Sequence, residues 1–382
     1  MLPMRIFQLV PNLNYGGLQE VVRSLALCQL RSGHSVTIGC WTNASNHPET
    51  ERELEEAGAR IVYLRRAPDG TLFFDRLSLV RMLKSCLGRQ NADILHVHNP
   101  FDYYLYGAIA ARLAGGTAIV QTLHATVMFD LAARRSAGAT RLKVAKTKAK
   151  FLAGAMLTDK IVSVCPESEV ILRSIFTLPS KKLCTIDNGI ELAPFLAVPA
   201  RPLRNEIVFG AVARMSLEKN HRVLIEAFAL VRRNHGNIRL RLLGGGPLEQ
   251  KLREQVKQHD LDDVVEFCGF SHDVCGFYNS LDVFVLASLS EALPLSLLEA
   301  IASGLPVVAT KVGGMARIVD KTNSGWLCEP QDTAALVAAL ESAIACTDRK
   351  NKGERARHLV VEHYAAERMN RDYDLLYRQL LG

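Results

Sequence analysis

The chain has 382 residues, a formal net charge of +7 at pH 7, 48% hydrophobic residues and 22% charged residues. This length exceeds one ordinary core and predicts two domains of roughly 150 to 200 residues, and the composition excludes a disordered protein. No apolar run reaches the roughly 18 residues of a membrane-spanning helix, and the first residues are interrupted too soon for a signal peptide.

The nine cysteines are scattered and include no Cys-x-x-Cys pair, so we expect reduced thiols rather than a disulfide framework or a metal site. The expected compartment is the cytoplasm. The positive charge favours anionic partners, among them nucleotides, lipid head groups and nucleic acid, but does not choose between them.

Strands and helices alternate through the first half of the chain. Short apolar runs predict strands over residues 4–11, 36–41, 60–64, 94–98, 118–123, 160–164 and 183–187, and helical spacing predicts helices over 18–32, 48–57, 76–87, 141–157 and 167–176. This winding predicts a parallel open sheet with helices on both faces, in which ligands gather at the carboxyl ends of the strands.

A glycine pair, Gly16 and Gly17, lies between the first strand and the first helix. Glycine at this place lets the backbone approach a ligand closely and point amides at a phosphate, although a plain tight turn is the alternative. The G-x-G-x-x-G fingerprint is absent, which argues against a nicotinamide enzyme.

Three histidines lie at strand ends: His96 and His98 in DILHVHNP, followed by Asn99, and His124 in QTLHA. A histidine in such a place is more often structural than catalytic. We take His96 and His98 to alternate across the strand, and we therefore expect at most one of them to face a ligand.

Residues 128–157 carry seven basic side chains against one acid, Asp130. The basic residues are Arg134, Arg135, Arg141, Lys143, Lys146, Lys148 and Lys150, and the apolar residues Leu142, Ala145, Ala149, Leu152 and Met156 recur at helical spacing. The pattern predicts an amphipathic basic helix. Such a helix could lie on an anionic membrane through Arg141 to Lys150, or it could pack on the core through its apolar stripe and leave its basic face in solvent. We favour the packed helix.

A proline-rich segment, ELAPFLAVPARPLRNE, follows the turn at residues 188–190 and predicts a linker with the domain boundary near Pro202. The second half resumes the alternation. It has predicted strands at residues 207–213, 238–243, 264–267, 281–287, 305–309 and 325–328, helices at 222–234 and 333–346, and a long helical tail at 350–381 that is interrupted or bent around His363.

Two cations, Arg214 and Lys219, lie where the strand at 207–213 feeds the next helix, an arrangement that suits a diphosphate. The run 244–246 is three glycines and lets a backbone pass close to a ligand before Pro247 starts a helix; a flexible turn is the alternative. Phe270 follows the strand at 264–267.

The stretch LDVFVLASLSEALPLSLLEAIASGLPVVAT concentrates the most information. It predicts a strand, a loop with Glu291, a helix with Pro294 in its first position and Glu299 inside it, and a stop at Gly304. The N–H groups around Leu295, Ser296 and Leu297 form a helix N-terminus that suits an anion. Two glutamates eight residues apart are common by chance. The alternative to a binding site is that Glu299 is an ordinary carboxylate on the helix surface and Glu291 a first-turn residue.

The glutamate spacing in this context closely resembles the signature of the retaining glycosyltransferase family 4. The loop in VARMSLEKNHRVLIEAF and the entry TIDNGIELAPF resemble the same family, and the resemblance covers nearly the whole chain. It implies two Rossmann-like domains of the GT-B fold that face across a cleft, with the acceptor on residues 1–200, the donor on residues 201–361, and a last helix at about 362–382 that returns to the first domain.

The resemblance also implies roles for the residues above. His124, Arg214, Lys219 and Glu291 would be catalytic; the donor would contact Gly16, Gly17, Arg214, Lys219, Gly246, Phe270, Glu291, Pro294, Leu295, Ser296 and Glu299. Arg214 and Lys219 would stabilise the leaving diphosphate, Glu291 would face the transferred sugar, and Glu299 would bind the ribose hydroxyls.

The implied reaction is the transfer of a sugar, with retention of anomeric configuration and without a metal ion, from a UDP- or GDP-sugar to a saccharide or lipid-linked hydroxyl. It would serve surface polysaccharide, lipopolysaccharide or glycolipid synthesis. No cofactor and no nucleic acid partner are expected. No residue is a secure nucleophile. A nucleotide-sugar 2-epimerase and a sugar-nucleotide binding protein without turnover are the alternatives, and a dehydrogenase ranks last. Leu293-Pro294 replaces the Phe-Gly of many relatives, which leaves the donor hexose open.

Overall fold

The computed structural model describes residues 2–14, 16–41, 48–64, 76–98, 102–124, 141–176, 178–197, 205–271 and 273–382, with the backbone alone at 102, 103 and 141–144. The chain forms two compact units: unit 1 is Met1–Gly189 with Ala366–Gly382, and unit 2 is Ile190–Ala365. The boundary expected near Pro202 lies outside the described residues.

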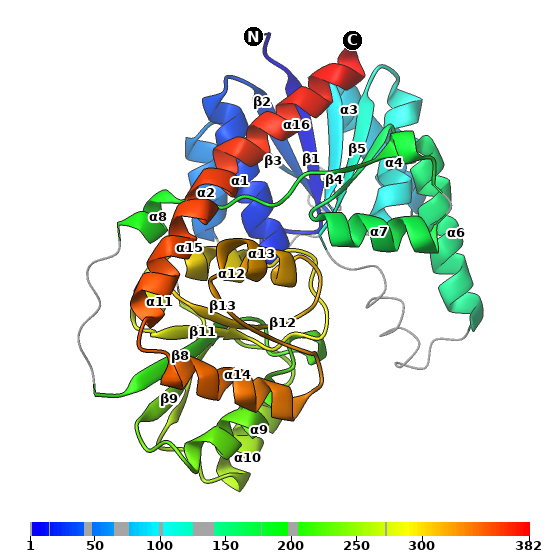
Figure 1. Cartoon of the computed structure of the whole chain (residues 1–382). Coiled ribbons are helices and arrows are strands. Elements are labelled where there is room, and N and C mark those ends of the chain that lie inside the picture. Colours follow the sequence, from blue (N-terminus) through cyan, green and yellow to red (C-terminus); the bar gives the residue numbers. More distant parts are fainter. Residues whose placement is uncertain are drawn as a thin grey trace. The chain divides into compact units, whose positions relative to one another are not determined.

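Unit 1 is built on a parallel sheet of seven strands in the order β3-β2-β1-β4-β5-β6-β7 (Figure 1). The strands are β1 (Arg5–Val10), β2 (Ser35–Cys40), β3 (Arg60–Tyr63), β4 (Ile94–His98), β5 (Ala118–Leu123), β6 (Lys160–Ser163) and β7 (Leu183–Thr185). The helices are α1 (Gly17–Arg31), α2 (Pro48–Glu56), α3 (Arg76–Gln90), α4 (Asp102–Ala114), α6 (Arg141–Leu157), α7 (Pro166–Ile175) and α16 (Ala366–Leu381).

The core of unit 1 lies on both faces of this sheet. Phe7 and Leu9 pack on one face with residues of α3 and α4, while Val10 packs on the other with Val22 of α1. The alternation along β1 therefore serves two helical layers, as the doubly wound class requires. The strand order reverses between β1 and β4, which is where ligands bind such sheets.

Unit 2 repeats this plan with six parallel strands in the order β10-β9-β8-β11-β12-β13. The strands are β8 (Ile207–Val212), β9 (Ile238–Leu243), β10 (Val265–Gly269), β11 (Val283–Leu286), β12 (Val307–Thr310) and β13 (Gly325–Cys328). The helices are α8 (Ala193–Leu196), η2 (Leu217–Lys219), α9 (His221–Arg232), α10 (Glu249–Gln258), α11 (Val274–Asn279), α12 (Leu295–Ala302), α13 (Met315–Thr322), α14 (Thr333–Ala345) and α15 (Arg349–His363). Its strand order reverses between β8 and β11.

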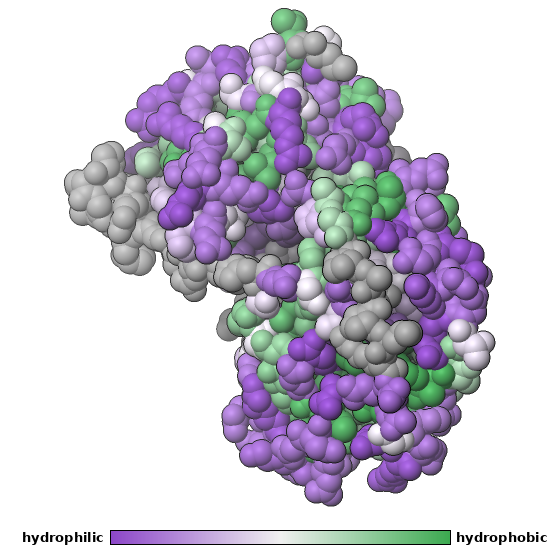
Figure 2. All heavy atoms as spheres, turned by 90° about the vertical axis from the view of Figure 1, so that its left-hand side faces the viewer, coloured by the Kyte–Doolittle hydropathy of each residue, from purple (hydrophilic) through white to green (hydrophobic). Residues whose placement is uncertain are grey.

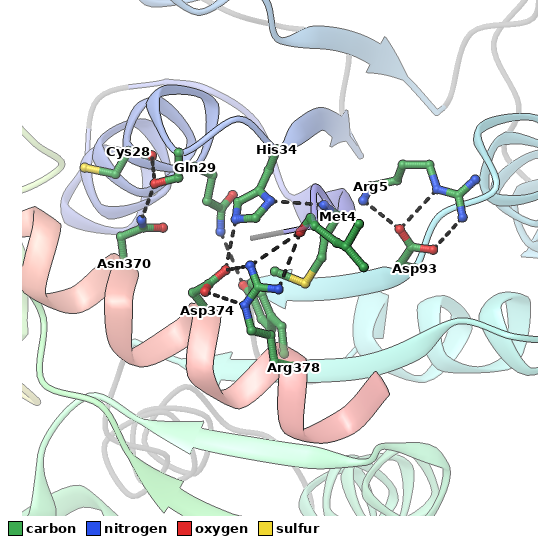
Figure 3. A network of polar contacts seen from close by, with 12 residues as sticks. Met4, Arg5, Cys28, Gln29, His34, Asp93, Asn370, Asp374 and Arg378 are labelled. Atoms are coloured by element: carbon green, nitrogen blue, oxygen red, sulfur yellow. Dashed lines mark hydrogen bonds and ion pairs between the residues drawn. The ribbon is translucent and has the colours of Figure 1, made fainter. Parts of the chain in front are cut away.

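The last helix, α16, belongs to unit 1, where it lies beside α1 (Figure 1). Asp374 of α16 lies 2.9 Å from Nε2 of the buried His34, whose Nδ1 accepts a hydrogen bond from the backbone N–H of Met4 (Figure 3). Arg378 donates to Asp374 and to the backbone oxygen of Leu2. These contacts hold the two ends of the chain together within unit 1, and the predicted break in the tail is confirmed between α15 and α16.

The face of α6 that packs on unit 1 differs from the prediction. Phe151 and Ala155 are buried, and Gly154 lies so close to the Tyr104 ring that an added Cβ would be 2.5 Å from it. Leu152 and Met156, members of the predicted apolar stripe, are 38% and 79% exposed. The prediction that this stripe packs on the core is wrong, because contact with α4 uses the small residues that let two helices approach closely.

Among the described α-helices, four were not predicted: α4, which is apolar nearly all round, and the short α8, α11 and α13. On the side of the molecule shown in Figure 2, hydrophilic side chains cover most of each unit and apolar atoms lie in separate patches between them. None of the described helices is both long enough and apolar enough to cross a membrane. All nine cysteines are free thiols, as predicted.

Candidate functional site

Lys219 and Glu291 form an ion pair at the point where the strand order of unit 2 reverses. Lys219 follows β8 and Glu291 follows β11, the neighbouring strand, so their loops leave the same edge of the sheet. The ammonium nitrogen lies 2.6 Å from Oε1 of Glu291, and the two side chains are 21% and 10% exposed. The Ser288 hydroxyl donates to the same oxygen at 2.7 Å. Two residues that lie 72 positions apart in sequence are thereby joined.

The backbone around this pair is braced from both sides. The N–H of Leu289 donates to the backbone oxygen of Glu218 at 2.7 Å, which ties the two loops together. On the other side, Gly313 has φ +51°, and an added Cβ would lie 2.0 Å from the backbone oxygen of Glu291. The site therefore requires glycine at position 313, a residue that the sequence reasoning did not single out.

Arg214 is exposed on the loop after β8, next to the run of three glycines. Gly246 has φ +159°, and a Cβ there would lie 2.5 Å from the backbone oxygen of Met215. A Cβ on Gly245 would lie 2.7 Å from the ring of Phe270, which is 69% exposed. Glycine is thus required at position 246 by close backbone packing between the loops after β8 and β9, and a flexible turn does not describe this position. At Gly245 the nearest atoms belong to an exposed side chain, which can move.

Glu299 lies inside α12, and Glu291 lies in the loop before it, as predicted. Pro294 is the N-cap of α12 rather than its first helical residue, and its side chain makes no capping hydrogen bond. The hydroxyl of the fully buried Tyr278 donates to Oε2 of Glu299 at 2.8 Å. Burial, and then the neighbouring Glu299 carboxylate, hold the pKa of Tyr278 well above its ordinary value. Tyr278 orients Glu299 but lies in α11, which the sequence pattern did not reveal.

His221, the first residue of α9, is buried, and neither ring nitrogen has a hydrogen-bond partner among the described residues. Burial, reinforced by the charge of Lys219, lowers the pKa of His221 to about 4. This histidine is therefore neutral, so the positive charge of the loop comes from Lys219 and Arg214.

The glycine pair of unit 1 follows β1. Gly16 is the N-cap of α1 in extended backbone, and Gly17 is its first residue. A Cβ added to Gly17 would meet no described atom within 4 Å. The fold of the described chain therefore does not require glycine at position 17, in contrast to positions 246 and 313.

The three strand-end histidines of unit 1 contact one another. The expectation that His96 and His98 alternate across the strand is wrong, because residues two apart on a strand share one face. His98 Nδ1 lies 3.0 Å from His124 Nε2, and the rings of His96 and His98 lie 3.8 Å apart. Burial holds the pKa of His96 and His98 well below its ordinary value and lowers that of His124 to about 3. All three are neutral at pH 7. Asn99 lies outside the described residues.

No group of three or more His, Cys, Asp or Glu side chains that could hold a metal ion occurs in the described part of the chain. The expectation of a metal-independent reaction without a cofactor stays a prediction.

Two family models match the chain side by side. The model described as Glycosyltransferase Family 4 matches residues 15–193, and the one described as Glycosyl transferases group 1 matches residues 199–359. The chain belongs to glycosyltransferase family 4. The first model ends and the second begins within ten residues of the contact boundary at Gly189, so each unit of this family member carries one of the two models.

Named relatives agree with this membership. The chain is 32% identical over 212 residues to the putative colanic acid biosynthesis glycosyltransferase WcaL of Escherichia coli, a match that covers 53% of this chain and 52% of the relative. It is 26% identical over 314 residues to the N-acetyl-alpha-D-glucosaminyl L-malate synthase of Bacillus anthracis, covering 80% and 79%. The chain thus spans about half the length of WcaL.

Among solved structures, HepE of Anabaena in complex with UDP and glucose superimposes with a TM-score of 0.83 at 18% identity, covering 99% of this chain and 100% of that one. This likeness shows the fold: two parallel-sheet α/β units of the GT-B type.

Proposed function

We propose that this family 4 member is a retaining glycosyltransferase that moves a sugar from a UDP- or GDP-sugar to a hydroxyl group. The hydroxyl would belong to a saccharide or lipid-linked acceptor, and the reaction would serve the synthesis of a surface polysaccharide, lipopolysaccharide or glycolipid. The observation that carries the proposal is the Lys219–Glu291 pair at the strand reversal of unit 2. The names of WcaL and of the UDP complex of HepE support the substrate class.

Lys219 and Arg214 would hold the diphosphate of the donor. An ammonium group has three N–H donors, so Lys219 can bind a phosphate oxygen while it stays bonded to Glu291. Negative charge grows on the diphosphate as the glycosidic bond breaks, and fixed cations stabilise that charge more in the transition state than in the ground state. The N–H groups at the start of α12 add partial positive charge.

Glu291 would orient the hydroxyls of the transferred sugar, and Glu299, held by Tyr278, would accept hydrogen bonds from the ribose. Phe270 and the backbone of Gly246 would hold the base, while Gly16, Gly17 and His124 on unit 1 would serve the reacting sugar or the acceptor. No side chain is assigned as a nucleophile; a front-face path, in which the leaving phosphate assists the acceptor hydroxyl, accounts for retention.

A panel of UDP-, GDP- and ADP-sugars tests the donor class by thermal shift. A ligand at 100 times its dissociation constant adds about 2.7 kcal/mol of stability. Product analysis with and without an acceptor then separates the reactions. Transfer with retained anomeric configuration supports the proposal, whereas epimerised donor without transfer establishes the 2-epimerase, and binding without turnover establishes a sugar-nucleotide binding protein.

We also propose that α6 contacts an anionic membrane surface. Leu152 and Met156 are exposed on the same helix as the basic residues Lys146 and Lys148, and no described part of unit 1 covers them. Each basic residue near an anionic surface contributes about 1 kcal/mol. Sedimentation with vesicles of anionic or zwitterionic lipid tests this. Salt-sensitive binding to the anionic vesicles that weakens in Met156→Glu supports the surface, and equal sedimentation with both lipids rules it out.

A further inference from the structure

A chain of buried hydrogen bonds in unit 1 leads from α1 to His124. Gln8 of β1 stands at its centre: its Nε2 donates to Oε1 of Gln29 at 2.8 Å, and its Oε1 accepts from Nε2 of His98 on β4. Gln8, Gln29 and His98 are each at most 1% exposed. Gln29 in turn donates from Nε2 to the hydroxyl of Tyr377 on α16, at 3.5 Å. The amide of Gln8 is therefore held from both ends.

This series of hydrogen bonds determines which nitrogen carries the proton in the rings of His98 and His124. The amide oxygen of Gln8 can only accept, so Nε2 of His98 carries hydrogen. A neutral imidazole has one N–H, so Nδ1 of His98 is an acceptor, and it lies 3.0 Å from Nε2 of His124. Nε2 of His124 must therefore be the donor. The tautomer is assigned here from the bonding partners and not from hydrogen positions.

The other nitrogen of His124 then carries a lone pair. Nδ1 of His124 is buried and has no hydrogen-bond partner among the described residues, although the residue as a whole is partly exposed. A buried acceptor without a donor costs free energy, and native proteins leave few of them unless a ligand or water completes the bond. It lies directly after the carboxyl end of β5, the edge at which this fold binds ligands.

We propose that Gln8 and His98 are positioning residues that hold His124 as its Nε2–H tautomer, so that Nδ1 accepts a hydrogen bond from a hydroxyl of the transferred sugar or of the acceptor. The inference rests on the proposed function and specifies one of its contacts. The partner must be a hydrogen-bond donor; a phosphate or carboxylate oxygen would face a lone pair and be repelled.

The arrangement explains why such a contact needs two further residues. An isolated histidine interconverts between tautomers, and part of its population would present an N–H at Nδ1 to the hydroxyl. Gln8 is an obligatory acceptor two hydrogen bonds away. The wrong tautomer of His124 would therefore set two acceptors against each other in a buried site, either Nε2 of His124 against Nδ1 of His98 or Nε2 of His98 against the oxygen of Gln8. Gln8 thus acts on the ligand contact through His98 without touching the ligand.

The test uses the full-length protein labelled with ¹⁵N histidine. Long-range ¹H–¹⁵N spectra identify the unprotonated ring nitrogen, and His124→Asn assigns the signals of His124. We expect Nδ1 to be unprotonated in the wild type. In Gln8→Leu, which removes the obligatory acceptor, we expect both tautomers to appear and kcat/KM for transfer to fall about 3- to 10-fold, the size of one neutral hydrogen bond.

Tyr373→Phe is the matched control. The Tyr373 hydroxyl lies 2.8 Å from the Thr122 hydroxyl, and the Thr122 hydroxyl lies 2.7 Å from Nε2 of His96. The change therefore removes one buried hydrogen bond from a neighbouring branch and leaves Gln8, His98 and His124 in place. It should lower stability while leaving the His124 spectrum and kcat/KM unchanged. Equal kinetic losses in Tyr373→Phe and Gln8→Leu would show a merely structural role and overturn the proposal.

A series of donor and acceptor analogues, each lacking one hydroxyl, identifies the ligand group. For one analogue the rates of the wild type and Gln8→Leu should become equal, because the contact that the tautomer serves is gone. If every analogue keeps the difference, His124 accepts no substrate hydroxyl. Protonation of Nδ1 in the wild type overturns the inference even if Gln8→Leu fails to fold. If no sugar is transferred at all, the proposed function fails, and the spectra still decide the tautomer.

Discussion

The ion pair between Lys219 and Glu291 allows the sharpest test of the site in unit 2. Glu291→Gln keeps the shape of the side chain and the hydrogen bond from Ser288 but removes the charge. Lys219→Met keeps the aliphatic stem and removes the ammonium group. The two changes and their combination form a double-mutant cycle, which isolates the coupling between the charges.

The expected coupling follows from the geometry. At 2.6 Å and an effective dielectric constant of about 20, the Coulomb energy of two unit charges is about 6 kcal/mol, an upper limit from which the loss of hydration is subtracted. Hydrogen bonds to charged groups contribute about 1.5 to 3 kcal/mol net. Because the two side chains are 21% and 10% exposed, we expect a coupling of about 1 to 3 kcal/mol in the free energy of unfolding.

Activity should respond far more than stability. Removal of one preorganised group that stabilises transition-state charge costs about 10²- to 10³-fold in kcat. If the pair acts as one device, the double variant should be no slower than the slower single variant. Urea unfolding, followed by two independent probes because the chain has two units, gives the stabilities, and initial rates with the identified donor give kcat and KM.

Lys311 and Glu329 supply the control. This pair is in the same unit at 3.0 Å, but its side chains are 46% and 62% exposed, so Lys311→Met and Glu329→Gln should show no measurable coupling and normal activity. The reasoning is refuted if the variants at Lys219 and Glu291 lose less than about threefold in kcat/KM, or if their effects on kcat/KM multiply independently. The pair would then be an ordinary ion pair in a loop.

Three further outcomes are expected. Gly313→Ala combines the cost of a positive φ with a clash against the backbone oxygen of Glu291, so it should destabilise the protein by about 2 to 5 kcal/mol. Gly33→Ala, which has a positive φ but open space around its Cβ, should cost about 1 to 2 kcal/mol. Equal shifts of the urea midpoint in the two variants would contradict this expectation. In the folded chain the pKa of the buried His96 and His98 lies well below 6.5, so the two rings stay neutral where the unfolded chain already binds protons. As the pH falls from about 7.5 to 5, the free energy of unfolding should therefore fall by up to about 2 kcal/mol for each histidine. Urea titrations that show no change in stability over this pH range would refute the expectation. Gly17→Ala should leave the melting temperature unchanged or slightly raised, since nothing lies where its Cβ would go, and raise KM for the donor; unchanged KM would mean that no ligand approaches there.

The element order was predictable because parallel strands buried on both faces are apolar runs that glycines and prolines interrupt. Helix α6 was predicted with its true bounds, and so were strands β4, β5, β9 and β13. The helices that escaped prediction lacked this contrast: α8, α11 and α13 are too short for a period to show, and α4 is apolar on most sides. Which face of α6 packs inward could not be read either, because it depends on the shape of α4.

The separate positions of Glu291 in a loop and Glu299 in a helix were also predictable, since a loop and a helix can be told apart from local sequence. Their partners were not. Tyr278 and Ser288 are ordinary residues in sequence, and only the fold places their hydroxyls on the two carboxylates. Gly313 likewise looks like any turn glycine until the Glu291 backbone is seen against it.

By itself, therefore, the sequence determined the doubly wound class, the order of the elements and the residue types at the strand ends, because these depend on periodicity and on interactions within a few positions. The tertiary structure decided which of those residues meet. Lys219 joins Glu291 across 72 positions, and Gln8 joins His98 across 90, because neighbouring parallel strands bring distant segments to one edge. Hydrogen bonding and charge act over a few ångströms of space, and separation along the chain does not specify that distance.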